Sequence, residues 1–250
     1  MKFSPYLTTA PQFFLATCYR DGRGVPQDHA KAVHWFAKAA ELGHPRAQFN
    51  LGLSYQHGRG IAQDYVQAAS WFSKAAEQGH AGAQYGFGQL LGHGRGVDRD
   101  DAQAFFWYSK AAEQGDVEAQ FSLGACYRDG VGVAQDDTMA FHWFSQAAEH
   151  GHAAAQFFVG LSFAQGLGVA QDDEMAPYWY TMAAHRGVAE AQVNLGLLFK
   201  DGRGVAQDSS MALFWFTKAA EQGHATAEDN LGQSYRLGQF VPKNDATAVH

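Results

Sequence analysis

The sequence predicts an all-α protein, an α/α solenoid built from 36-residue helix-turn-helix repeats. Its tryptophans recur every 36 residues, at Trp35, Trp71, Trp107, Trp143, Trp179 and Trp215. The glycine that opens each turn keeps the same period, at Gly22, Gly58, Gly94, Gly130, Gly166, Gly202 and Gly238. Each unit also holds two apolar stretches with helical spacing, separated by glycine. A fixed period of this length is typical of stacked supersecondary units rather than of one globular core.

The first stretch of each unit predicts a helix with one apolar face. From Ala47, apolar residues recur at i, i+4 and i+8, and a glycine stands beside them. Glycine inside a helix costs about 1 kcal/mol relative to alanine, so we expect a neighbouring helix to approach closely there. Gly58 is expected to end the helix in a left-handed conformation, and Gly60 to keep the link tight. The helix glycines are Gly52, Gly88, Gly124, Gly160, Gly196 and Gly232.

The second stretch predicts a helix that begins after an aspartate cap. Asp64 supplies a short oxygen acceptor for the exposed amide groups of the first turn. Apolar residues then fall at Ala68, Trp71 and Phe72 and at a pair of alanines, so the helix has a wide apolar face. The alanines permit close helix packing, and we expect the tryptophan column to fill the interior beside them. Counterparts of the cap stand at Asp28, Asp100, Asp136, Asp172, Asp208 and Asn244.

These columns resemble a known repeat family. The pattern A-x-x-x-L-G-x-x-Y-x-x-G-x-G-V, followed by D-x-x-x-A-x-x-W-F/Y-x-K-A-A-E-x-G-H, is similar to the Sel-one-like repeat (SLR) family of the tetratricopeptide-like superfamily. The resemblance covers residues 11–250 and recurs in every copy. It implies a right-handed superhelix of α-hairpins, and family members mostly act as adaptors that hold other proteins.

The repeats divide the chain after a short N-terminal segment. Residues 1–10 belong to no repeat, and Pro11 opens the first unit, where the first turn of a helix tolerates proline. Complete units are expected at 11–46, 47–82, 83–118, 119–154, 155–190 and 191–226, with a truncated seventh at 227–250. The remnant after Asn244 is short for a stable helix. We therefore expect residues 238–250 to be mobile and this end to self-associate.

One proline interrupts the pattern inside a predicted helix. Pro177 lies five residues after the cap Asp172, where it removes a backbone donor and crowds the preceding turn. We expect that helix to bend or to start late.

Composition limits the classes of function. The net charge is −7, which argues against a general nucleic-acid binder. No signal peptide and no apolar run of membrane-spanning length is seen, so the default location is the cytoplasm, with export left open if the chain is a fragment. Cys18 and Cys126 share a column three units apart, beyond disulfide reach, which is compatible with a reducing compartment.

An aromatic column on the first helices is a candidate binding surface. Its members resemble the groove-facing positions of tetratricopeptide proteins and would anchor an extended or helical peptide. The alternative is that these rings pack against the adjacent hairpin, as helically spaced aromatic residues often do. The column consists of Phe13, Phe49, Tyr85, Phe121 and Phe157, and Val193 and Asp229 then replace the aromatic residues.

A basic column follows on the same face. Its members are Arg20, Arg128, Lys200 and Arg236, and the turns add Arg23, Arg59, Arg95 and Arg203. Such an edge would suit the carboxylates of a partner. The alternative is local compensation on a solvated rim, because Asp21, Asp129 and Asp201 adjoin three of the four.

The remaining motifs are interpreted as structural rather than as phosphate-binding, metal-binding or catalytic sites. The G-R-G turns follow a helix and lack G-K-[ST], so they are not phosphate loops. His44, His80, His152 and His224 are interpreted as turn residues, because successive repeats hold them too far apart to share a metal ion. No nucleophile, base and orienting acid cluster in the sequence. We therefore expect no enzymatic activity, no cofactor and no metal.

The sequence thus predicts a protein–protein interaction scaffold that holds a client on a preformed concave surface of first helices. An alternative is a regulatory or inhibitory subunit that positions an enzyme of the cell envelope, as some members of the resembled family do. A third hypothesis, a helical-repeat RNA reader, is opposed by the acidic balance and the lack of a continuous basic stripe.

Overall fold

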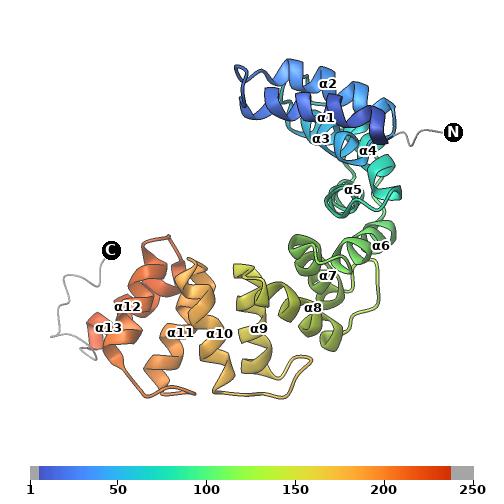
Figure 1. Cartoon of the computed structure of the whole chain (residues 1–250). Helices are drawn as coiled ribbons and strands as arrows, with labels where there is room; N and C mark the ends of the chain where they lie inside the picture. Colours follow the sequence, from blue (N-terminus) through green and yellow to red (C-terminus); the bar gives the residue numbers. More distant parts are fainter. Residues whose placement is uncertain (1–5, 238–250) are drawn as a thin grey trace. The chain divides into compact units, whose positions relative to one another are not determined.

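The computed structural model describes residues 6–237, which form thirteen helices and no strand (Figure 1). The chain divides into two compact units, residues 1–135 and 136–250. The first contains α1 (Tyr6–Asp21), α2 (His29–Glu41), α3 (Pro45–His57), α4 (Tyr65–Glu77), α5 (Ala81–His93), α6 (Asp101–Ala112) and α7 (Val117–Asp129). The second contains α8 (Asp137–Glu149), α9 (Ala153–Gln165), α10 (Met175–His185), α11 (Ala189–Asp201), α12 (Ser209–Ala220) and α13 (Ala225–Leu237).

The helices pair as the repeat pattern predicts. In the first unit α1 packs against α2, α3 against α4, and α5 against α6, and each second helix also packs against the next first helix. The second unit repeats this arrangement with α9 against α10 and α11 against α12. The predicted all-α solenoid of about 36-residue repeats is therefore confirmed, whereas the right-handed sense of a superhelix stays a prediction.

The predicted helix ends are confirmed at Asp64 and Gly58. Asp64 accepts hydrogen bonds from the backbone N–H groups of Val66 and Gln67, at 2.9 and 3.0 Å. Gly58 ends α3 with a φ of 65°. Gly60 also has a positive φ, and a side chain there would collide with the backbone of His29 at the start of α2. The link between two hairpins is thus pressed against the preceding repeat.

Two prolines test the predicted helix starts. The expectation that Pro11 lies in a first turn was wrong, because α1 already begins at Tyr6. The expectation for Pro177 is confirmed, since α10 begins only at Met175, whereas α4 begins at Tyr65, directly after its cap. The prediction of Asp172 as the N-cap is therefore wrong, because the cap position is Glu174; Oδ1 of Asp172 still accepts from the N–H groups of Glu174 and Met175, at 2.9 and 3.0 Å. Proline cannot donate the backbone bond that would hold an earlier turn.

The centre of each hairpin is occupied by the aromatic ring that follows the tryptophan. Phe72 is fully buried on α4, as Phe36 is on α2 and Phe216 on α12. Most tryptophans are only half-buried, so the expectation of an interior tryptophan column is corrected; Trp215 is the buried exception. The ammonium nitrogen of Lys74 lies over the half-buried ring of Trp71, 4.1 Å from the ring centroid. The tryptophans thus border the solvent while the next residue fills the core.

A buried glutamine column joins successive helix ends. Gln48 on α3 donates from Nε2 to the carbonyl of Ala40 at the end of α2, at 3.1 Å. Its Oε1 accepts from Nε2 of Gln78, at the end of α4, at 2.7 Å. Buried polar groups need such partners, so these bonds stabilise the spacing of successive second helices. The same pairing recurs between Gln84 and Gln114 and between Gln192 and Gln222.

The C-terminal predictions fall outside the described residues. Mobility of residues 238–250, capping by Asn244 and self-association through this end concern a segment after α13, which ends at Leu237. Within residues 6–237, no helix combines the length and the apolar character that crossing a bilayer requires.

Candidate functional site

A niche between successive first helices recurs in the same register. In the first unit, a cavity of about 300 Å³ lies between α1, α2 and α3, and one of about 260 Å³ lies between α5, α6 and α7. In the second unit, a cavity of about 160 Å³ lies between α9, α10 and α11. Equivalent columns line all three, so the repeat itself generates the niche. We call them the Arg20 niche, the Cys126 niche and the Asn194 niche.

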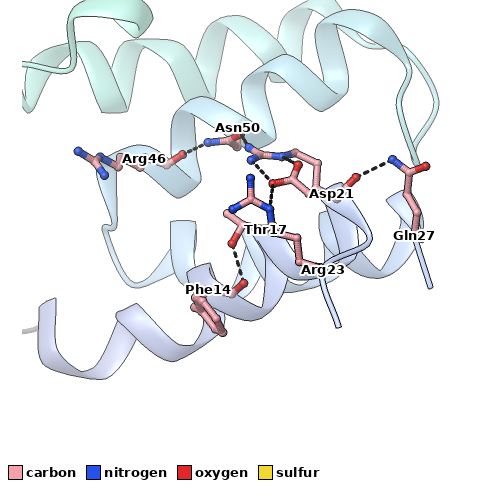
Figure 2. Close-up of polar contacts among 8 residues, drawn as sticks. Phe14, Thr17, Asp21, Arg23, Gln27, Arg46 and Asn50 are labelled. Atoms are coloured by element: carbon pink, nitrogen blue, oxygen red, sulfur yellow. Dashed lines mark hydrogen bonds and ion pairs between the residues drawn. The ribbon is translucent and has the colours of Figure 1, made fainter. Parts of the chain in front are cut away.

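The Arg20 niche is built around a fixed guanidinium. Arg20 donates from Nε and Nη2 to the two carboxylate oxygens of Asp21, at 2.7 and 3.0 Å. Its Nη1 donates to Oδ1 of Asn50 on the next first helix, at 2.8 Å, and Nδ2 of Asn50 donates to the carbonyl of Arg46 at 2.7 Å (Figure 2). The hydrogen bonds from Arg20 hold the pKa of Asp21 below its usual value.

Basic and apolar side chains complete this niche. His29, His57 and Arg59 line it together with Arg20 and Asn50. Ala32, Phe36 and Leu53 supply apolar surface. No carboxylate is among the residues that line the cavity in this described part of the chain. The niche therefore has a positive rim over an apolar floor.

The Cys126 niche differs from the Arg20 niche because carboxylates line it. Asp101 and Asp129 stand in the columns that His29 and His57 occupy in the Arg20 niche. Arg99 pairs with Asp101 at 2.9 Å and Arg128 with Asp129 at 2.7 Å. Burial raises the pKa of the Cys126 thiol to about 11, so the thiol is protonated at neutral pH and is a poor nucleophile.

The Asn194 niche is smaller and mostly uncharged. Leu161, Leu197 and Leu198 line it with Gln165, Tyr180 and Asn194. Its guanidinium belongs to Arg203, which pairs with Asp173 at 3.4 Å. Burial raises the pKa of Tyr180 to about 12, so its hydroxyl stays protonated and can donate a hydrogen bond.

The predicted aromatic column packs against its own hairpin and the next repeat. The ring of Phe13 lies 5.9 Å from that of Phe36 and stacks on His44 at 4.6 Å. Phe49 stacks on His80 at 4.5 Å in the same way. Tyr85, Phe121 and Phe157 are also half-buried, and Val193 is buried. These contacts match the packing interpretation, and anchoring of a peptide by these rings stays a prediction.

One ring of this column also lines a wider cleft. A cleft of about 450 Å³ lies beside the N-terminal half of α1 and the N-terminal end of α3. Phe13, Pro45 and Ala10 contribute apolar surface, and Arg46 is the cation. Gln78, Gly79 and His80 complete its wall. We call it the Phe13 cleft.

Two of the four residues of the predicted basic column are compensated locally. Arg20 and Arg128 each bond the aspartate that follows them. Lys200 is half-buried at the end of α11, and Arg236 is exposed near the end of α13. Of these four residues, Arg20 is the one that lines a described cavity. Sequence reasoning missed its partner Asn50 and the lining residue His57, although the i, i+3, i+4, i+7 spacing from Asn50 marks one helix face.

The histidine column supplies helix caps. Nδ1 of His44 accepts from the N–H of Ala47 at 3.2 Å, and His80 and His152 cap α5 and α9 in the same way. Burial lowers the pKa of His44 and of His80. Within residues 6–237, no three His, Cys, Asp or Glu side chains converge as metal ligands do.

The repeat model of one family fits almost the whole chain. The Sel1 repeat matches residues 12–44, 45–80, 81–116, 117–152, 153–188, 189–224 and 225–250. The chain belongs to the Sel1 repeat family. Proteins with Sel1 repeats are generally scaffolds for protein–protein interaction, and their helical solenoid is typically non-enzymatic.

Solved structures with Sel1 repeats resemble this fold. A protective antigen with an SLR fold, present in uropathogenic Escherichia coli strains, is 38% identical with a TM-score of 0.91; the match covers 96% of this chain and 52% of the antigen. The chain thus spans about half of that antigen's length. A Sel1 repeat protein from Oxalobacter formigenes is 31% identical with a TM-score of 0.81, over 95% of this chain and 93% of that protein. None of the curated proteins matches the chain.

Proposed function

We propose that this Sel1-repeat chain is a scaffold that binds a protein or peptide client through the niches between its first helices. The observation that carries the proposal is the repetition of one niche in one register with different lining residues. The Arg20 niche is cationic, the Cys126 niche holds two ion-paired carboxylates, and the Asn194 niche is mostly apolar. A client that spans the repeats of the first unit would meet two different subsites, the Arg20 niche and the Cys126 niche, which is a source of specificity.

The niches are preformed by the fold. Arg20 is held by three hydrogen bonds, and its helix ends at a left-handed glycine. A binding surface that is ordered before the client arrives avoids much of the entropy cost of association. This rigidity supports a scaffold role over a surface that folds on binding.

The other two hypotheses have less support. A regulator of a cell-envelope enzyme would use the same surface, and that role stays a prediction. An RNA reader draws on long-range attraction to phosphates, and the net charge of −7 opposes that attraction.

Affinity capture with two matched variants tests the proposal. Ser54 lines the Arg20 niche, so Ser54→Phe would fill it. Ser70 is exposed on α4 in the column that Phe106 occupies on α6, so Ser70→Phe is the control. We expect the wild type and Ser70→Phe to retain the same proteins from a cell lysate, and Ser54→Phe to lose them. Loss by Ser70→Phe with retention by Ser54→Phe would overturn the proposal.

A further inference from the structure

The guanidinium of Arg20 is held in place by hydrogen bonds that do not use all of its N–H donors. Its three hydrogen bonds to Asp21 and Asn50 use three of the five N–H groups that a guanidinium carries. The others, one on Nη1 and one on Nη2, belong to a group that lines the niche. A guanidinium held in this way loses little conformational entropy when it binds an anion.

The charges around Arg20 are unbalanced. Asp21 contacts both Arg20 and Arg23, with 3.6 Å between its Oδ2 and Nε of Arg23, so one carboxylate faces two cations. Arg59 adds a further positive charge on the rim, and His29 and His57 add two imidazole rings, each with at least one N–H donor. Charge complementarity therefore favours a carboxylate, which a guanidinium binds through short charge-assisted hydrogen bonds.

The Phe13 cleft lies on the same two helices as the Arg20 niche, nearer their N-terminal ends. Phe13 and Arg20 are seven residues apart on α1, and Arg46 and His57 are eleven apart on α3. At 1.5 Å per helical residue, the two cavities are separated by about 10–16 Å along the helices. An extended peptide covers that distance with about three to five residues.

We propose that the first unit binds an acidic peptide, with an Asp or Glu side chain in the Arg20 niche and an apolar side chain about three to five residues away in the Phe13 cleft. This inference rests on the proposed function, because it takes the first-helix surface to be the client surface. The apolar floor formed by Ala32, Phe36 and Leu53 suits a peptide side chain. The protein's net charge of −7 disfavours a polyanion such as RNA.

The specificity for an acidic residue is local to this niche. In the Cys126 niche, Gly92 replaces the Arg20 column and Ser122 replaces the Asn50 column. Asp101 and Asp129 stand there in place of the two histidines. Carboxylates repel an acidic side chain. We therefore expect a carboxylate-bearing peptide to bind at the Arg20 niche and not at the Cys126 niche.

Labelled hexapeptide pools test the proposal by fluorescence anisotropy with the full chain. The probe pool has Leu or Phe at position 1, Glu at position 6, mixed residues between them and an amidated C-terminus. Matched pools carry Gln, Lys or phosphoserine at position 6, or Ala at position 1. We expect the Glu pool to bind at least about tenfold more tightly than the Gln pool, as loss of a charged hydrogen-bond partner predicts.

Substitutions in one repeat column locate the site. Arg59→Gln and Arg20→Gln are expected to weaken binding of the Glu pool about tenfold, because each removes a cation from the niche. Arg95→Gln is the control, since Arg95 is one repeat after Arg59 and lies over the ring of Tyr65. It should bind like the wild type. If Arg20→Gln lowers the unfolding midpoint, the Arg59→Gln result decides.

Other outcomes overturn the inference without overturning the scaffold. Equal binding of the Glu and Gln pools, tighter binding of the Lys or phosphoserine pool, or no binding of any pool would each reject the acidic peptide. The lysate capture with Ser54→Phe tests the scaffold independently. A client that Ser54→Phe loses, combined with any of these peptide results, would leave the scaffold standing with a client of different chemistry.

Discussion

The ring of Phe72 occupies the space that a side chain at Gly52 would need. A Cβ atom on Gly52 would lie 2.6 Å from two ring carbons of Phe72, which is fully buried on the other helix of the same hairpin. The same relationship holds between Gly88 and Tyr108 and between Gly196 and Phe216, at 2.8 and 2.7 Å. Glycine on the first helix is therefore the counterpart of an aromatic ring on the second.

Gly52→Ala is expected to destabilise the protein even though alanine favours helix. Alanine would gain about 1 kcal/mol of helix propensity, but overpacking against a buried ring costs about 1–3 kcal/mol. Gly92→Ala is the control, because a Cβ there would meet its nearest neighbours at 3.6 Å. In urea denaturation we expect the midpoint to fall for Gly52→Ala and to rise or hold for Gly92→Ala. The same rise for both variants would contradict the packing described here.

The buried aromatic column should contribute more to stability than the tryptophans do. Phe72 is fully buried and Trp71 is half-buried. Phe72→Ala is expected to cost about 3–5 kcal/mol, as large-to-small changes in a core do, and Trp71→Ala distinctly less. Chemical unfolding of the two variants measures the difference. A larger loss for Trp71→Ala would restore the tryptophans as the core.

Gly60 should be less replaceable than its equivalent in the first repeat. Gly60 and Gly24 have similar φ angles, 75° and 73°, so alanine suffers the same left-handed strain at both. A side chain at Gly60 would also collide with the backbone of His29, whereas nothing lies within 4 Å of a Cβ at Gly24. We expect Gly60→Ala to lower the unfolding midpoint clearly more than Gly24→Ala. Equal losses would mean that the turn does not press on the preceding repeat.

Acid should weaken the histidine-capped helices. Burial lowers the pKa of His80 in the folded protein, with a smaller contribution from Arg46, and its Nδ1 caps α5 as an acceptor. A depressed folded pKa means that the unfolded chain binds the proton more readily, so this stability is present above about pH 6.5 and is lost as the pH falls through the folded pKa. We expect the denaturation midpoint to drop between pH 7.5 and pH 5.5.

The chain itself offers the matched substitution for that test. Asp116 stands in the same column as His80 and caps α7 by accepting from the N–H of Ala119 at 3.0 Å. In His80→Asp the cap should persist without the histidine titration, so the drop between the two pH values should shrink relative to the wild type. An unchanged drop would exclude His80 as its source.

The repeat period and the caps could be predicted from the sequence because they depend on local chemistry. Asp64 and Gly58 act within one or two turns of their own helix ends, where side-chain type decides the outcome. Which of Trp71 and Phe72 is buried in the hairpin could not be predicted, because neighbouring positions on one helix differ by only about a quarter turn in direction. Which of them faces the partner helix depends on packing.

The candidate site was predictable only in part for the same reason. Arg20 stands out as a basic residue in a recurring column, but its partner Asn50 lies 30 residues away on the next first helix. Their contact follows from the stacking of hairpins. The cavity that they share with His57 and Arg59 exists only in the folded unit.

Site-specific photo-cross-linking tests the central claim, that clients bind between the first helices, most directly. A photoreactive amino acid would replace His57, which lines the Arg20 niche, or Ser70, which is exposed on α4. Both variants would be irradiated in cells, and the cross-linked partners compared by mass. The account predicts a covalent client adduct from position 57 and none of that mass from position 70. The same adduct from position 70 alone would contradict it.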